Sequence, residues 1–178
     1  FIIGPTASGK TKLATLLAAE LDAEIISIDS RQIYQQLNIG SGKDLREYIV
    51  DGKAIPYHLI DTVRPGENYN VSQFQNDFGL ITRQIRTKGK LVIACGGTGL
   101  YAESVLNALP KGINSVRVFC LNPSGEVRRQ RISNRLKERF EEGMLEEVST
   151  LLQQGISPDW LKRLGLEYRL ITQHLLQE

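Results

Sequence analysis

The chain has 178 residues, of which 41% are hydrophobic, and a formal net charge of +2. This length and composition fit one domain with a substantial core, and the mild charge does not by itself indicate a nucleic-acid partner. No stretch approaches the roughly 20 apolar residues of a membrane span, and no charged-then-apolar leader precedes the first strand. Cys95 and Cys120 lie in apolar runs, which favours reduced core thiols over a disulfide. We therefore expect a cytoplasmic protein without membrane contact.

Residues 4–11 read Gly-Pro-Thr-Ala-Ser-Gly-Lys-Thr and match the phosphate-binding loop (P-loop) pattern G-x-x-x-x-G-K-[ST]. An apolar stub precedes the loop and a helical pattern follows it, so backbone N–H groups and a helix N-terminus can converge on one anion. Lys10 can reach the terminal phosphates, and the Thr11 hydroxyl is placed to bind Mg²⁺. The expected phosphate-binding residues are Gly4, Thr6, Ala7, Ser8, Gly9, Lys10 and Thr11, with Thr11 as the metal ligand.

Hydrophobic periodicity predicts alternating strands and helices along the rest of the chain. The leucines at 13, 16, 17 and 21 are expected to form the apolar face of the first helix, and Ser72 is expected to cap the second. The expected helices cover 12–21, 73–88, 100–109, 126–140, 144–154 and 166–177, and the expected strands cover 1–3, 24–29, 57–60, 91–95 and 116–121, with a polar loop at 38–53. This order predicts an α/β protein of the P-loop NTPase type, in which residues 1–178 form a single domain around a doubly wound parallel sheet with helices on both faces.

Ligands of open parallel sheets bind at the carboxyl ends of the strands. Asp29 ends one predicted strand, and Gly96, Gly97 and Thr98 follow another. Asp29 could act as a general base, hold Mg²⁺ through water, or simply cap the next helix. A P-loop ATPase usually places an acidic Walker-B residue after a strand such as 91–95, and this chain does not. Thr98 could bind a phosphate oxygen or an amine, unless the glycine turn serves backbone geometry alone.

Four arginines of the predicted helix 126–140 share one face. Their planar guanidinium groups could close over phosphates, because they pair with phosphate oxygens in a bidentate manner. The alternative is a solvated helix face paired with nearby glutamates. The isolated histidines are expected to be structural, and the single aromatic residues could stack on a base but are more often packing residues. These residues are Arg128, Arg131, Arg135 and Arg139, then His58 and His174, and Tyr101, Trp160 and Tyr168.

Together these motifs resemble the tRNA dimethylallyltransferases, also called tRNA isopentenyltransferases. The resemblance rests on the P-loop, on Asp29-Ser-Arg-Gln-Ile-Tyr34, and on Gly96-Gly-Thr-Gly-Leu-Tyr101. Matches at 38–43 and 56–61 complete the first hundred residues in the right order, and weaker matches continue at 131–135, 143–148 and 165–169. The resemblance implies transfer of a dimethylallyl group from its diphosphate to N6 of an adenine beside the tRNA anticodon.

The resemblance also implies roles for particular residues. The P-loop would hold the departing diphosphate, with Lys10, Thr11, Mg²⁺ and Arg135 neutralising its charge. Asp29 would accept the N6 proton, and Thr98 would assist at the reacting centre, so the expected catalytic residues are Asp29, Thr98 and Arg135. The adenine would leave its stack to enter a pocket lined by Asp29, Ser30, Arg31 and Gln32.

One departure from the family pattern leaves the acceptor open. Family members carry a helical insertion that grips the anticodon arm, which we expect near residues 109–115; the printed sequence does not show it, either because the segment is left out or because the chain is a shortened homologue. The expected partners are dimethylallyl diphosphate and tRNA, and the chain is expected to be a monomer. Free adenine nucleotide stays an alternative acceptor. A P-loop small-molecule or nucleoside kinase, and a module that binds RNA or nucleotide without catalysis, are the alternatives from other classes.

Overall fold

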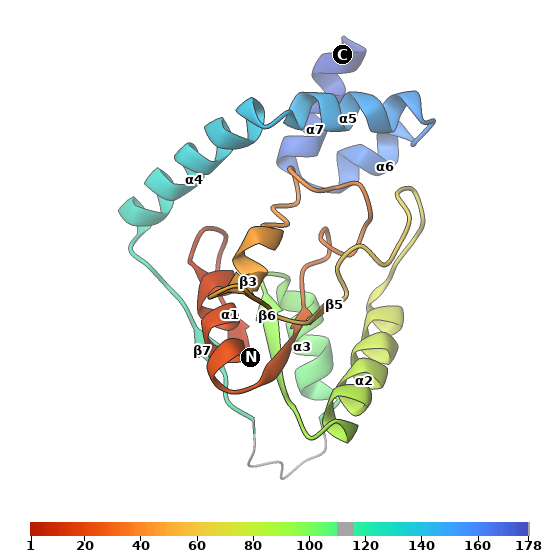
Figure 1. Ribbon diagram of the computed structural model, residues 1–178. Helices are drawn as coiled ribbons and strands as arrows, with labels where there is room; N and C mark the ends of the chain where they lie inside the picture. The colour runs from red at the N-terminus through yellow and green to blue at the C-terminus, as the bar shows by residue number, and fades with distance from the viewer. Residues whose placement is uncertain (110–115, 178) are drawn as a thin grey trace.

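A computed structural model describes residues 1–109 and 116–177 of the chain (Figure 1). The insertion expected near residues 109–115 falls on a segment that lies, from residue 110, outside the described residues.

A parallel sheet with the strand order β5-β2-β6-β1-β7 forms the centre of the molecule. Its strands are β1 (Ile2–Ile3), β2 (Ala23–Ser27), β5 (Tyr57–His58), β6 (Leu91–Gly96) and β7 (Phe119–Cys120). The longest pairing joins β2 to β6, from Ala23 opposite Leu91 to Ser27 opposite Cys95. Because all these strands run in one direction, their carboxyl ends lie at the same edge, which faces upward in Figure 1.

Helices cover both faces of the sheet, which confirms the predicted α/β fold. Helix α1 (Lys10–Glu20) packs on one face, and α2 (Val71–Thr87) and α3 (Gly99–Asn107) pack on the other. Adjacent residues of β2 separate accordingly: Ile25 belongs to the buried cluster of α1, and Ile26 belongs to the cluster of α2 and α3. This alternation is what a strand buried on both faces requires.

The predicted apolar face of α1 is half right, because Leu13 and Leu17 are partly buried against the core cluster on this side of the sheet. Ala14, Thr15 and Ala18 are the buried residues of this helix, whereas Leu16 and Leu21 are exposed. Small side chains let the helix backbone approach the sheet closely, and this steric need overrides the leucine spacing.

Helix α2 buries Phe74, Phe78 and Ile85, as predicted, but Ser72 does not cap it. Asn70 is the N-cap: its side chain accepts the backbone N–H of Gln73 at 3.0 Å, and the Gln73 side chain accepts the backbone N–H of Asn70 at 2.9 Å. This reciprocal capping box satisfies two otherwise unpaired donors, so the helix begins before Ser72.

Four helices follow the sheet: α4 (Gly125–Glu141), α5 (Met144–Gln153), α6 (Pro158–Arg163) and α7 (Leu166–Leu176). Figure 1 shows α4 rising along one side of the molecule and α5, α6 and α7 lying beyond the carboxyl ends of the strands. Trp160 and Tyr168 are buried packing residues, as expected, and Trp160 meets the ring of Tyr34 edge-on with centroids 4.9 Å apart. Helix α6 was not expected, and it begins at a proline, which suits a first helical turn.

Three further expectations need correction. The predicted loop 38–53 contains a short 3₁₀ helix, η1 (Leu45–Tyr48), and the hairpin of β3 (Ile49–Val50) and β4 (Lys53–Ala54). The predicted strand 116–121 pairs only at β7, which is an edge strand. Cys120 is therefore exposed, whereas Cys95 is buried, and burial raises the pKa of the Cys95 thiol to about 12.

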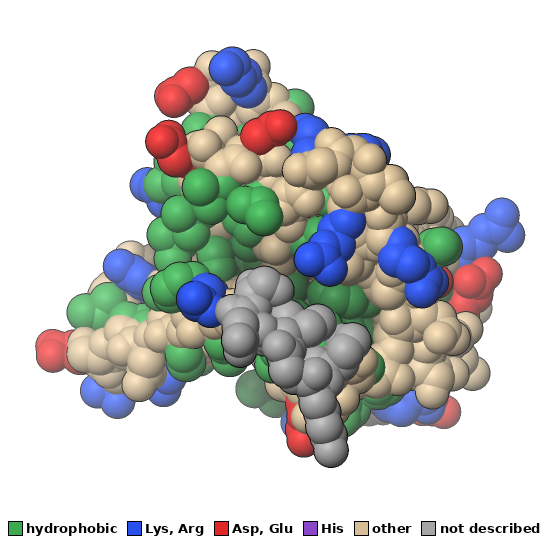
Figure 2. Space-filling model, turned by 90° about the horizontal axis from the view of Figure 1, so that it is seen from below, with side chains coloured by type: hydrophobic (Ala, Val, Ile, Leu, Met, Phe, Trp, Pro, Cys, Tyr) green, Lys and Arg blue, Asp and Glu red, His purple; other side chains and the backbone are tan. Residues whose placement is uncertain are grey.

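The end of the molecule opposite the carboxyl ends of the strands is seen in Figure 2, where hydrophobic side chains show between Lys and Arg side chains.

Within the two described ranges, no helix combines the length and the apolar composition that a bilayer crossing needs.

Candidate active site

The P-loop joins β1 to α1 and presents Lys10 at the carboxyl edge of the sheet. Gly9 precedes the helix with a left-handed φ of 86°, which closes the turn. Lys10 Nζ lies over the loop and donates to the carbonyl oxygen of Pro5 at 2.7 Å. Burial lowers the pKa of Lys10, Asp29 opposes this effect and Arg135 adds to it. A partly desolvated ammonium group above a P-loop is well suited to bind a phosphate oxygen.

Asp29 and Thr98 lie at the carboxyl ends of neighbouring strands, and short hydrogen bonds hold both. Thr98 Oγ1 accepts the backbone N–H of Ser30 at 3.0 Å and donates to Ser30 Oγ at 3.3 Å. Asp29 Oδ1 accepts the backbone N–H of Arg31 at 3.0 Å. Residues 30–33 form turns, so Asp29 stabilises a turn and does not cap a helix. One Asp29 oxygen is left for other partners.

Gly96 and Gly97 stand at the end of β6, where an acidic residue is missing. A Cβ atom on Gly96 would lie 2.6 Å from the backbone carbonyl of Ile28, so no larger residue fits there. A Cβ atom on Gly97 would lie 3.8 Å from Lys10 Nζ. The glycine pair therefore packs the end of β6 tightly against β2 and beside the P-loop, in the place where an ATPase would carry its Walker-B carboxylate.

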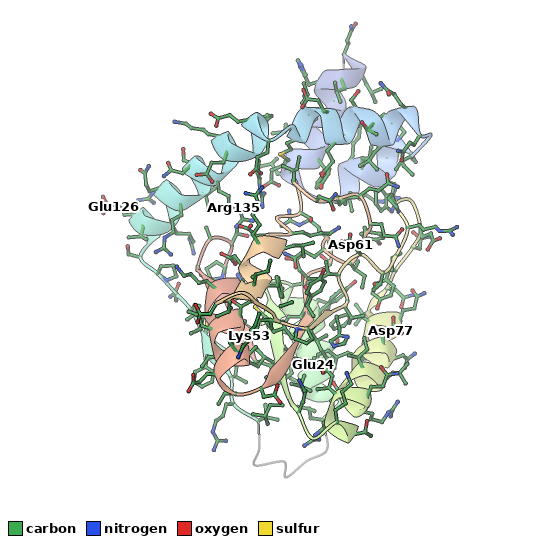
Figure 3. All side chains as sticks on the ribbon, viewed as in Figure 1. Glu24, Lys53, Asp61, Asp77, Glu126 and Arg135 are labelled. Atoms are coloured by element: carbon green, nitrogen blue, oxygen red, sulfur yellow. The ribbon has the colours of Figure 1, made fainter. Side chains whose placement is uncertain are left out.

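A cavity of about 900 Å³ separates the P-loop from α4. Its walls include Ala7, Ser8, Gly9, Lys10 and Thr11 on one side and Arg131, Arg135 and Arg139 on the other. Figure 3 shows Arg135 extending from α4 toward the body of the molecule. Burial lowers the pKa of Arg135, and Arg31 adds to this effect, whereas Asp44 and Asp29 oppose it. The expected arginine face thus meets the P-loop across the cavity, although Arg128 is not part of the lining, and neither are Gly4 and Thr6.

A second pocket, of about 410 Å³, is lined by aromatic side chains. Tyr34, Tyr69, Tyr101 and Trp160 contribute to it together with Ser30 and Arg31, and such a lining suits a planar base. Gln32, which was expected here, is not in the lining. Its side-chain amide instead donates to the carbonyl oxygen of Gly42 at 3.1 Å and accepts from Ser27 Oγ at 3.0 Å.

Asp29 lines neither space, contrary to the expectation that it lines the adenine pocket, but it is linked to residues that line each of them. It precedes Ser30, which lines the aromatic pocket, and its charge acts on Lys10 and Arg135, which line the phosphate cavity. Asp29 is therefore the carboxylate best placed to act on compounds held in these two spaces.

The residues at the P-loop fit Mg²⁺ only as a partner of a bound phosphate. Thr11 offers one hydroxyl at the cavity wall. Among the described residues, no group of three or more His, Cys, Asp or Glu side chains could hold a metal. Mg²⁺ commonly keeps several waters and binds through substrate phosphates with one or two protein ligands, which matches this set.

Sequence reasoning missed Glu147 of α5. Its carboxylate accepts the backbone N–H groups of Asn38, Ile39 and Gly40 at 2.7, 2.7 and 3.1 Å, and the Tyr168 hydroxyl at 2.9 Å. The side chain thereby ties the loop that borders the phosphate cavity to the C-terminal helices. Glu147 lies within the weaker family match 143–148, which was the available signal, but periodicity predicts only a helix over 144–154 and no role for this side chain.

The fold and the site define a P-loop α/β enzyme that binds a phosphorylated substrate next to an aromatic pocket. The family model described as IPP transferase matches residues 32–117 and 110–178. The chain belongs to this family, which is the family of the tRNA dimethylallyltransferases.

Individual relatives agree with this family assignment. The chain is similar to tRNA dimethylallyltransferase 1 of Azobacteroides pseudotrichonymphae genomovar. CFP2, with 43% identity over 239 aligned residues that cover 98% of this chain and 78% of the relative. Its structure is similar to the crystal structure of the tRNA isopentenylpyrophosphate transferase of Bacillus halodurans, with a TM-score of 0.86 and 26% identity over 99% of this chain and 76% of that one. A eukaryotic dimethylallyltransferase shares the fold, with a TM-score of 0.75 and 18% identity over 99% of this chain and 66% of that one.

The resemblance stated from the motifs is therefore confirmed. The chain is an enzyme of a tRNA-modifying transferase family, and the comparisons favour neither the kinase alternative nor the non-catalytic alternative.

Proposed function

We propose that this chain transfers the dimethylallyl group of dimethylallyl diphosphate to N6 of the adenine next to the anticodon of tRNA. Family membership supports the reaction, and the position of Asp29 supports its placement in this chain. Asp29 adjoins the aromatic pocket through Ser30 and acts electrostatically on Lys10 in the phosphate cavity.

The diphosphate would lie in the phosphate cavity. The P-loop N–H groups, Lys10 and Arg135 bind it and neutralise the negative charge that grows as the bond between carbon and oxygen breaks. Thr11 would hold Mg²⁺, which supplies further charge neutralisation on the diphosphate oxygens. This use of the P-loop needs no carboxylate to activate water, in keeping with glycines at the end of β6.

The adenine would lie in the aromatic pocket with N6 directed at Asp29. The N6 nitrogen forms the new bond to the dimethylallyl carbon, the diphosphate leaves, and the Asp29 carboxylate accepts the N6 proton. The oxygen of Asp29 that does not bind Arg31 N–H is free for this task. Thr98 would fix Ser30, and with it the wall of the adenine pocket.

The choice of acceptor depends on the insertion expected near residues 109–115. The alignment to the Azobacteroides relative extends over 239 residues, more than the chain has, and the two family matches meet at residues 110–117. Both observations support a segment of the relatives, inserted near residues 109–115, that has no counterpart here. Free adenine nucleotide therefore stays the second candidate acceptor. A monomer located in the cytoplasm remains our expectation.

Incubation with radiolabelled dimethylallyl diphosphate and Mg²⁺, with either unmodified tRNA or AMP as acceptor, tests the proposal. We expect label in tRNA, and its position next to the anticodon is checked by nuclease digestion and mass spectrometry. Label in AMP alone would replace tRNA by free nucleotide as the acceptor. If the protein binds dimethylallyl diphosphate but labels neither tRNA nor AMP, the proposal is contradicted.

A further inference from the structure

Arg139 is a charged side chain that the proposed mechanism does not use. It lies on α4 one turn beyond Arg135 and is only 7% exposed. Its Nη1 donates to the carbonyl oxygen of Gly40 at 3.2 Å, whereas its buried Nη2 has no hydrogen-bond partner. Among the described residues, neither Arg139 nor Arg135 lies within ion-pair distance of a carboxylate.

The two arginines converge on one point at the edge of the phosphate cavity. A Cβ atom on Gly42 would collide with Nη2 of Arg135 and with Nη2 of Arg139, so both guanidinium groups lie against the same glycine. Gly42 has a φ of 69°, which favours glycine in any case, and both arginines line the cavity. Two cationic ends therefore lie side by side at the cavity wall.

This arrangement is costly without an anion. Burial, together with like-charge repulsion from Arg135 and Arg31, lowers the pKa of Arg139 to about 10. A buried charge with an unpaired donor costs free energy, and replacing it by an apolar side chain of similar size is often neutral or stabilising. Purely structural packing at this position would be served better by methionine than by arginine.

We propose that Arg139 is a second diphosphate-binding arginine, whose Nη2 shares a terminal phosphoryl oxygen with Nη2 of Arg135. This inference rests on the proposed function, since it assigns the diphosphate to the cavity between the P-loop and α4. The oxygen supplies the acceptor that Arg139 Nη2 lacks and the negative charge that holds the two guanidinium groups together. With Lys10 on the opposite wall, the cavity then favours a diphosphate over a monophosphate.

The test compares Arg139→Met with Arg129→Met, a matched control at an exposed position of the same helix. Binding of magnesium pyrophosphate and of inorganic phosphate is measured by calorimetry, and the melting temperature is measured with and without pyrophosphate. We expect R139M to bind pyrophosphate roughly 10- to 100-fold more weakly, the range given by one lost charged hydrogen bond. Its affinity for inorganic phosphate should change less. Without ligand, R139M should melt at the same temperature as the wild type or higher.

Two outcomes would overturn the inference. One is R139M with wild-type pyrophosphate affinity, and the other is a wild type that binds pyrophosphate no better than phosphate. If R139M does not fold, Arg139→Lys serves instead. This variant should lose part of the pyrophosphate affinity, because lysine keeps the positive charge but lacks the planar guanidinium group with its two parallel N–H donors. The labelling assay on the wild type tests the proposed function independently of this inference. If the wild type binds pyrophosphate selectively and through Arg139 but transfers no prenyl group, the proposed function is refuted and the arginine pair is still a diphosphate site.

Discussion

Thr98 Oγ1 accepts the backbone N–H of Ser30 at 3.0 Å, so one side chain at the end of β6 fixes the residue that follows Asp29. Thr98→Val removes this acceptor and leaves the Ser30 N–H unpaired in a partly buried place. We expect kcat to fall about 10- to 100-fold, because small displacements of a reacting group are expensive in rate. Steady-state kinetics with dimethylallyl diphosphate check this, and Thr98→Ser, which keeps the hydroxyl, should retain most of the activity. Equal losses in both variants would argue against the hydrogen bond.

Asp29→Asn separates binding from chemistry. The asparagine Oδ1 can still accept the backbone N–H of Arg31, so the turn should persist. The proton acceptor is lost, and general-base catalysis is typically worth 10²- to 10⁴-fold in rate, so we expect kcat to fall by roughly that factor. Pyrophosphate affinity, measured by calorimetry, should change little. A variant that transfers the prenyl group at the wild-type rate would exclude Asp29 as the base.

The Glu24 carboxylate makes the stability of the fold depend on pH in the acidic range. It is 2% exposed, lies 2.8 Å from His58 Nε2, and accepts from Lys88 Nζ at 3.0 Å, which confirms His58 as a structural histidine. Burial raises the pKa of Glu24, but the hydrogen bonds from His58 and Lys88 outweigh burial and hold the pKa below its ordinary value. The stabilisation is therefore complete above the unfolded-state pKa of about 4.3 and is lost as the pH falls through the lower pKa of the folded state.

Glu24→Gln should lower the free energy of unfolding by about 1–3 kcal/mol at pH 7 and flatten its decline below pH 4.5. Urea titrations at several pH values measure both effects. Asp22→Asn is the control, because Asp22 pairs with Lys90 at 2.9 Å on the surface with its side chain 82% exposed, and it should change stability little. An unchanged pH dependence in E24Q would show that other groups control acid unfolding.

Glu147 should control the order of the loop at 38–40. Glu147→Gln offers one acceptor oxygen in place of two, and it turns an amide N–H₂ toward backbone donors. We expect a loss of about 1–3 kcal/mol and faster hydrogen exchange at Asn38, Ile39 and Gly40. Mass spectrometry of exchanged peptides measures the second effect. Glu146→Gln, at the exposed neighbouring position, should leave exchange at 38–40 unchanged.

The parts of this molecule that depend on local pattern could be predicted from the sequence. The P-loop, the alternation of strands and helices and the buried face of α2 follow from spacing within a few residues. The exposed leucines of α1 could not be predicted, because the distance between a helix and its sheet is a property of the packed fold. The same holds for Cys120, whose exposure follows from the place of β7 at the sheet edge.

The candidate site divides in the same way. Asp29, Lys10 and Thr98 could be proposed because strand ends in a parallel sheet meet at one edge. The roles of Glu147 and Arg139 could not, since both depend on where α4 and α5 settle against a loop about a hundred residues earlier in the chain. Gln32 shows the opposite case, in which a motif suggested a role that the structure does not support. It was expected to line the adenine pocket, but its side-chain amide is hydrogen-bonded to Gly42 and Ser27.

The direction of the strands has a consequence for how such an enzyme can diversify. Helix α3 ends, and the chain approaches β7, at the edge of the sheet opposite the carboxyl ends that carry Asp29 and Thr98. A segment gained or lost between α3 and β7 therefore has both of its attachment points far from the reacting atoms. Sequence can therefore be added or removed between α3 and β7 without displacing the strand ends that hold Asp29 and Thr98.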